Sequence, residues 1–98
     1  YYLLFKTICI VIERKKYYKF ENVYLFGSIL DDSKFSNDID LLLIYSSYSN
    51  RILDYLNQIS SFLETMYRLP VDFTVLSIEE EKDIEFLRRI YPKYIKLK

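Results

Sequence analysis

An Asp-Ile-Asp sequence at positions 38–40 opens the segment that most constrains the fold of this chain. The four residues that follow it are all leucine or isoleucine. Because successive side chains of a β-strand point to opposite faces, the even-numbered residues share one face with both aspartates, and the odd-numbered residues share the other. Both faces are apolar beyond Asp40, as in a strand that is covered on both sides. We therefore expect residues 38–45 to form a central strand of a sheet.

Two elements are predicted before this strand. Apolar residues recur at helical spacing through the first twelve positions, and lysines follow where positive charge favours a helix carboxyl end. We expect a helix at residues 2–19. Residues 23–26 are strand-forming and stop at Gly27, and the mostly polar residues at 29–37 indicate a loop.

Two further elements follow the central strand. Apolar residues with a helical period begin at Ile52, and this helix must end near Leu69 because Pro70 disfavours helical geometry in its predecessor. Residues 71–76 alternate as a third strand.

A last helix is predicted after the third strand. Ser77 and Glu80 have the spacing of a capping box, and Pro92 would stop the helix. We interpret the basic residues up to Lys98 as a solvated helix end rather than as a surface for RNA or a partner. The chain therefore has the order α-β-β-α-β-α and belongs to the α+β class. Its 98 residues, 51% of them hydrophobic, are expected to form a single domain over 1–98.

The composition limits the chemistry. Fourteen basic and fourteen acidic side chains cancel, so the chain lacks the positive balance of a protein that coats nucleic acid. It has no histidine, and Cys9 is its only cysteine, which excludes an internal disulfide and a multi-cysteine zinc site. Any catalysis must use carboxylates, hydroxyls and bound ions. The apolar amino-terminal segment is too short to span a bilayer, and we expect a cytoplasmic protein.

Three acids are candidates for a metal site. Asp38 and Asp40 would project from one face of a strand, where they can bind one divalent ion or bridge two, and magnesium suits such oxygen ligands. Asp72 would point into the same space if its strand is an in-register neighbour. Three carboxylates so close repel one another unless cations lie between them. In the opposing interpretation, these acids are solvated strand ends of an unrelated small domain and do not converge.

Gly27 is the only glycine, whereas a chain of this length holds about seven at average usage. It marks a position where a side chain is not tolerated. We interpret it, with Ser28, as a turn whose backbone approaches a phosphate opposite the paired carboxylates.

The joint pattern resembles the nucleotidyltransferase superfamily of DNA polymerase beta, and most closely its minimal, MNT-like branch of small stand-alone proteins. The resemblance rests on residues 25–28 (Leu-Phe-Gly-Ser), 37–43 (Asn-Asp-Ile-Asp-Leu-Leu-Leu) and 71–73 (Val-Asp-Phe), and the order of elements extends it across the chain. It implies a small two-layer fold, with helices packed on a mixed sheet of three or slightly more strands.

The resemblance also implies an activity and a site. The activity is the magnesium-dependent transfer of a nucleotidyl group, adenylyl in the simplest case, from a nucleoside triphosphate such as ATP to an acceptor hydroxyl. Two Mg²⁺ ions would bind at Asp38 and Asp40, and Asp72 would ligate one ion and serve the acceptor. Gly27 and Ser28 would hold the triphosphate, and we assign the same role to Lys34, the only cation of the following loop.

A protein partner is a further implication of the resemblance. Small relatives are often encoded beside a helical toxin of the HEPN type, which they neutralise by binding or by adenylylating a tyrosine. We therefore expect an antitoxin role with a HEPN-type toxin, or a second copy of the chain, as the partner that completes the site. The charge does not indicate a nucleic acid acceptor.

The loop after Ser28 supports an alternative function. Small members of the superfamily usually carry a second glycine and often an arginine there, whereas this chain has Asp31 and Asp32. Two acids beside a triphosphate oppose its binding. The alternative is a catalytically inactive nucleotidyltransferase fold that acts as a binding module on a protein partner.

Overall fold

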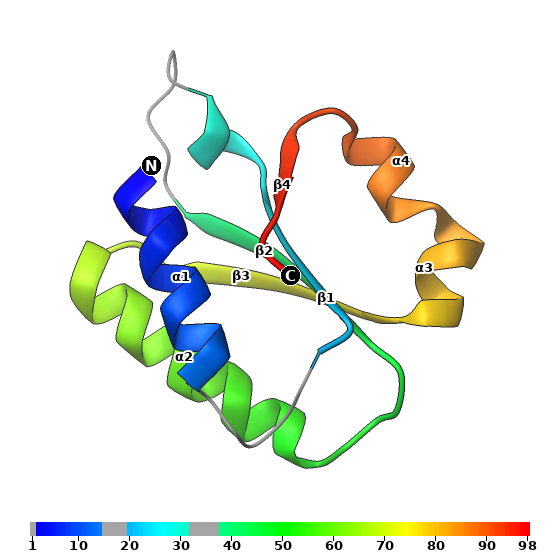
Figure 1. The fold of residues 1–98 in the computed structure, drawn as a ribbon, viewed down its shortest axis with the longest axis horizontal. Coiled ribbons are helices and arrows are strands. Elements are labelled where there is room, and N and C mark those ends of the chain that lie inside the picture. The colour runs from blue at the N-terminus through cyan, green and yellow to red at the C-terminus, as the bar shows by residue number, and fades with distance from the viewer. Residues whose placement is uncertain (1, 15–19, 32–37) are drawn as a thin grey trace.

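The computed structural model describes residues 2–14, 20–31 and 38–98 (Figure 1). Its elements are, in chain order, α1 (Tyr2–Arg14), β1 (Asn22–Phe26), the short 3₁₀ helix η1 (Ser28–Leu30), β2 (Ile39–Tyr45), α2 (Arg51–Tyr67), β3 (Val71–Ser77), α3 (Ile78–Ile84), α4 (Phe86–Ile90) and β4 (Tyr94–Lys96). The predicted order is confirmed up to β3. The end of the predicted first helix, residues 15–19, lies outside the described residues, as do positions 32–37 of the predicted loop.

The four strands form one mixed sheet in the order β3-β2-β1-β4. Strand β2 pairs in parallel with β3 and antiparallel with β1, and β1 pairs antiparallel with β4 on its other edge. The parallel pair needs a crossover connection, which α2 supplies. The prediction of a central strand is confirmed, since β2 has a neighbour on each side and its residues 41–43 are fully buried.

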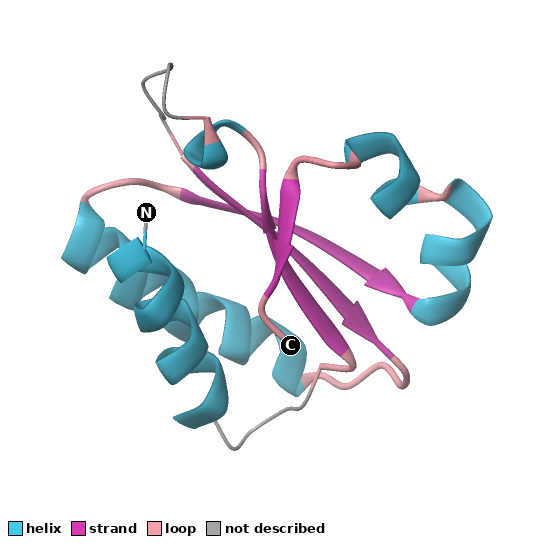
Figure 2. Cartoon of the chain, turned by 45° about the horizontal axis from the view of Figure 1, so that its top comes forward, coloured by secondary structure: helices cyan, strands magenta, loops and turns pink. Residues whose placement is uncertain are grey.

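The larger part of the core lies on one face of the sheet, beneath α1 and α2 (Figures 1 and 2). The odd-numbered residues of β2 point to this face. Helix α2 contributes every third or fourth residue, which is the stripe predicted for it. The buried members of this cluster are Leu4, Ile8, Phe20, Val23, Leu25, Ile39, Leu41, Leu43, Ile52, Tyr55, Ile59 and Leu63.

A smaller cluster lies on the opposite face, at the carboxyl half of β2. Leu42 and Ile44 are buried there with Tyr24, and Phe86 and Leu87 of α4 pack against them. Helices α3 and α4 thus cover the end of this face where β2 finishes. The face begins with the aspartates, so the acids lie at the opposite end of β2. The architecture confirms the α+β class and the polymerase beta-like arrangement of helices on a mixed sheet.

The predicted last helix is two short helices. The capping box is present, since the Glu80 N–H donates to the Ser77 hydroxyl at 3.0 Å and the Ser77 N–H donates to the Glu80 carboxylate at 2.8 Å. The helix then breaks at Glu85, which adopts left-handed geometry with φ 52°. The Glu81 carboxylate accepts the Leu87 N–H at 3.0 Å and so caps the start of the second helix.

The predicted basic tail is a fourth strand, which corrects the interpretation as a solvated helix end. Residues of β4 pair with β1, and beyond them the Leu97 N–H donates to the Val23 carbonyl at 2.7 Å. The exposed edge of β1 would otherwise present unpaired backbone groups to water. Among the described helices, none is long and apolar enough to cross a membrane.

Replacement of Ser77 by alanine should lower the free energy of unfolding by about 1 kcal/mol, because the Glu80 N–H loses its acceptor. Urea denaturation followed by circular dichroism measures the change. Ser61→Ala is the matched control: Ser61 is exposed within α2, where alanine is the better helix former, so its stability should stay equal or rise. Equal stability for Ser77→Ala and the native chain would contradict the capping role.

Candidate functional site

The parallel pairing of β2 with β3 brings three carboxylates together. Asp40 lies directly opposite Asp72, and Asp38 precedes β2 on the same side. One carboxylate oxygen of each residue lies within 4.8 Å of the other two. The expectation that the three acids share one space is therefore confirmed, and their convergence contradicts the interpretation as unrelated solvated strand ends.

The crowding of these acids disturbs their ionisation. Burial raises the pKa of Asp40 to about 6, and the charges of Asp38 and then Asp72 add to the shift. A hydrogen bond between the carboxyl groups of Asp38 and Asp72 raises the pKa of Asp38, with smaller contributions from burial and from the charge of Asp72. Each shift disfavours the fully charged cluster. A divalent cation reverses this preference, and three carboxylates are the hard oxygen ligands that magnesium takes.

Gly27 is required by the approach of a backbone turn to this cluster. Its φ of 86° is one that other residues rarely adopt, and a Cβ at this position would overlap the Asp40 carboxylate, with the Asp40 Cγ at 3.1 Å. The prediction that a side chain is not tolerated here is confirmed. The neighbour that excludes it is a carboxylate of the site.

The turn after Gly27 is a single 3₁₀ turn. The Leu30 N–H donates to the Gly27 carbonyl at 3.1 Å, and the Asp31 N–H donates to the Ser28 carbonyl at 3.0 Å. Ser28 thus sits at the first position of η1, directly after the residue that touches the acids. Lys34, the third residue assigned to triphosphate binding, lies outside the described residues.

Residues from the carboxyl-terminal part of the chain also reach the turn, which sequence reasoning missed. Lys93 and Leu30 line an open cavity of about 310 Å³ beside Gly27. A second cavity of about 270 Å³ extends from Gly27 along the end of α4. These residues were missed because the short strand β4 was not predicted. Its pairing with β1 carries them to the site.

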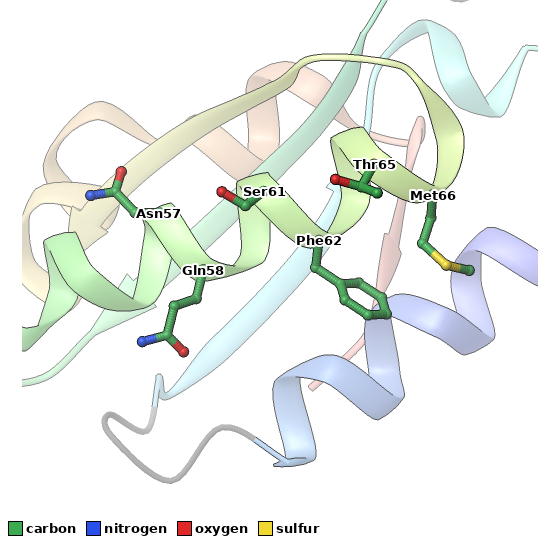
Figure 3. A pocket seen from close by; sticks show the side chains of 6 residues that line it. All are labelled: Asn57, Gln58, Ser61, Phe62, Thr65 and Met66. Carbon is green, nitrogen blue, oxygen red and sulfur yellow. The ribbon is translucent and has the colours of Figure 1, made fainter.

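A wider groove of about 600 Å³ lies elsewhere, along α2 (Figure 3). Helix α2 packs on the sheet face opposite the acids. Among the described residues that line the groove, none has an acidic or basic side chain. The lining residues are Asn57, Gln58, Ser61, Phe62, Thr65 and Met66.

A mixed sheet that joins a Gly-Ser turn to three convergent carboxylates has the architecture of nucleotidyltransferases. The family model described as polymerase beta, nucleotidyltransferase, matches residues 9–97. The chain therefore belongs to the polymerase beta nucleotidyltransferase family. No curated protein matches it by sequence.

Solved structures support the small MNT-like form of this fold. The MntA–HpeT toxin–antitoxin structure is 15% identical with a TM-score of 0.64, covering 96% of this chain and 72% of that chain. A toxin–antitoxin structure with AMP-PNP is 18% identical with a TM-score of 0.60, covering 95% and 72%. The structure of a tri-AMPylated Shewanella oneidensis HEPN toxin with MNT antitoxin is 15% identical with a TM-score of 0.59, covering 99% and 71%. At these identities the shared property is the fold.

Without metal, Asp40→Asn should raise the melting temperature at pH 7.5. The folded-state pKa of Asp40 lies above the ordinary value of 3.8, so its ionisation opposes folding above about pH 6, and that cost disappears as the pH falls toward 4. The amide removes the charge at every pH. Differential scanning fluorimetry in a chelator measures the shift. The control is Asp54→Asn in the exposed first turn of α2, which should not raise the melting temperature because it removes an acid that favours the helix start. A lower melting temperature for Asp40→Asn would contradict the view that ionisation of Asp40 opposes folding.

Magnesium should stabilise the native chain at pH 7.5 and lose this effect as the pH falls through about 6, because protons on Asp40 compete with the ion. The same fluorimetry with millimolar MgCl₂ from pH 5 to 8 measures it. Asp40→Asn should show little magnesium effect at any pH. A magnesium shift that is independent of pH would place the ion elsewhere.

Proposed function

We propose that this chain is a magnesium-dependent nucleotidyltransferase that moves an adenylyl group from ATP to an acceptor hydroxyl. The observation that carries the proposal is the convergence of three carboxylates within 4.8 Å beside the only glycine. Family membership supports the reaction class, and the similar fold of a structure with AMP-PNP supports an adenine nucleotide. Residues 1–98 as a single nucleotidyltransferase domain are part of the same proposal.

Each site residue has a proposed role. Asp38 and Asp40 hold two Mg²⁺ ions, and Asp72 ligates one of them on the side of the acceptor. Bound there, the ions would neutralise charge on the attacking oxygen and on the departing pyrophosphate. Asp72 also orients the acceptor hydroxyl and accepts its proton, because its exposed carboxylate faces solvent at the edge of the cluster.

The turn has the complementary role of holding the triphosphate. Gly27 lets the backbone come close to the Asp40 carboxylate. The Ser28 hydroxyl and Lys34 contact phosphate oxygens. Backbone N–H groups fixed in a short turn are preorganised donors for the charge that develops during transfer.

We propose a HEPN-type toxin as the partner, with a side-chain hydroxyl of that toxin as the acceptor. The support is the shared fold with structures described as toxin–antitoxin complexes, one of them with a tri-AMPylated HEPN toxin. The inactive binding module remains a second candidate, because Asp31 lines a cavity beside Gly27 and adds negative charge where a triphosphate would bind. In both cases the toxin is the bound protein, and only one includes transfer.

Label from α-³²P-ATP should pass to a co-expressed HEPN-type toxin with release of pyrophosphate when magnesium is present. The double change Asp38→Asn with Asp40→Asn should lower transfer at least about a hundredfold, because both residues supply metal ligands. Gel autoradiography measures the label, and Asp54→Asn should retain activity.

The outcomes separate the two candidates. Transfer that survives the double change would overturn the enzyme assignment. A stable complex with the toxin and no transfer by the native chain would establish the binding module instead.

A further inference from the structure

Two open cavities meet beside the glycine turn, and the same two residues line both. Gly27 and Lys93 are shared between the cavity that reaches Leu30 and Asp31 and the cavity that runs toward Phe26. The second cavity is further lined by residues 89–92 at the end of α4. Lys93 therefore stands against the turn on the side where these cavities open.

The sheet fixes the position of Lys93. Strands β4 and β1 lie side by side (Figures 1 and 2). Tyr94 pairs with Phe26 across their antiparallel ladder, which places Lys93 next to Gly27. The chain turns between α4 and β4, and in this turn the Lys93 N–H donates to the Ile90 carbonyl at 2.8 Å. An edge-to-face contact between the rings of Tyr94 and Tyr24, with centroids 5.4 Å apart, anchors the strand. The backbone of Lys93 is thus held between a turn hydrogen bond and the first paired residue of β4.

Gly27 has both acidic and basic neighbours. The carboxylate cluster touches Gly27 at Asp40, and Asp31 adds a further acid on the turn. Lys93 is the basic residue that lines the cavity with Asp31, and Arg89 adds a second cation in the adjoining cavity. Within the part of the chain that the structure describes, no ion pair engages either cation. Both are available to an anionic ligand.

We propose that Lys93 contacts the terminal phosphates of the triphosphate held at the Gly27 turn, and that Arg89 reinforces it. This inference depends on the proposed function, because the reacting phosphate must lie at the carboxylates. The remaining phosphates then extend past Gly27, where Asp31 would repel them unless a cation faces it. A lysine is a point charge suited to this contact, and a charge-assisted hydrogen bond to phosphate is among the stronger polar interactions.

Lys93→Ala should weaken the binding of AMP-PNP in magnesium about tenfold and leave the binding of AMP unchanged, because AMP lacks the terminal phosphates. Isothermal titration calorimetry of the full chain measures both affinities. Lys93→Arg should retain most of the AMP-PNP affinity. The matched control is Lys96→Ala: Lys96 is exposed on β4 but pairs opposite Tyr24, three positions before Gly27, and its loss should change neither affinity. Equal melting temperatures show that both variants fold.

Each failure has its own signature. If the native chain does not bind AMP-PNP in magnesium, the proposed function fails and this inference fails with it. If the native chain binds and Lys93→Ala binds equally well, only the role of Lys93 is overturned. A loss of AMP affinity equal to the loss of AMP-PNP affinity would also overturn it, since the cavity would then contact the nucleoside.

Discussion

The in-register parallel pairing of β2 with β3 is the constraint on which the candidate site depends. It places Asp40 opposite Asp72, and a shift of one residue would turn Asp72 to the other face of the sheet. The apolar residues on that other face hold the register, because Leu41 and Leu43 are fully buried among the side chains of α1 and α2. Burial of these leucines stabilises the sheet by more than the crowded carboxylates oppose it. Burial, and after it the charges of Asp38 and Asp72, raises the pKa of Asp40 to about 6, which shows that its ionisation opposes folding.

The second constraint is the contact between the turn after β1 and the acids of β2. Phe26 pairs with Asp40 across the antiparallel ladder, so the next residue must turn the chain away directly over the carboxylate. Only glycine allows this approach, since any Cβ would overlap Asp40. The turn and the carboxylates are thus one structural unit. A nucleotide bound at the turn would meet the three carboxylates without any rearrangement of the sheet.

The sequence predicts those parts of the molecule that depend on strong local patterns. The apolar run after Asp40 specifies a buried central strand, and the Ser77 capping box specifies the start of a helix; both are confirmed. Strand β4 has only three residues, and its partner in the sheet lies about seventy positions earlier in the chain. No local sequence pattern therefore predicts it. The break at Glu85 could not be predicted from the sequence either, because left-handed geometry is commonest at glycine and asparagine and Glu85 is neither. The residues around Lys93 could not be assigned to the site for this reason.

The pairing of β1 with β4 changes how the atypical loop of this chain should be understood. The resemblance leads us to expect an arginine after the Gly-Ser turn, whereas here the described turn carries Asp31, and Lys93, directly before β4, lines the cavity beside it. A cation that directly precedes a paired strand would lose less conformational freedom on binding than one on a long loop. In the proposed arrangement, metal ligands would come from β2 and β3, and phosphate contacts would come from the turn after β1 and from the residue before β4. A chain with no net charge can bind a polyanion under this arrangement, because the cation needs to act only at one end of one strand pair.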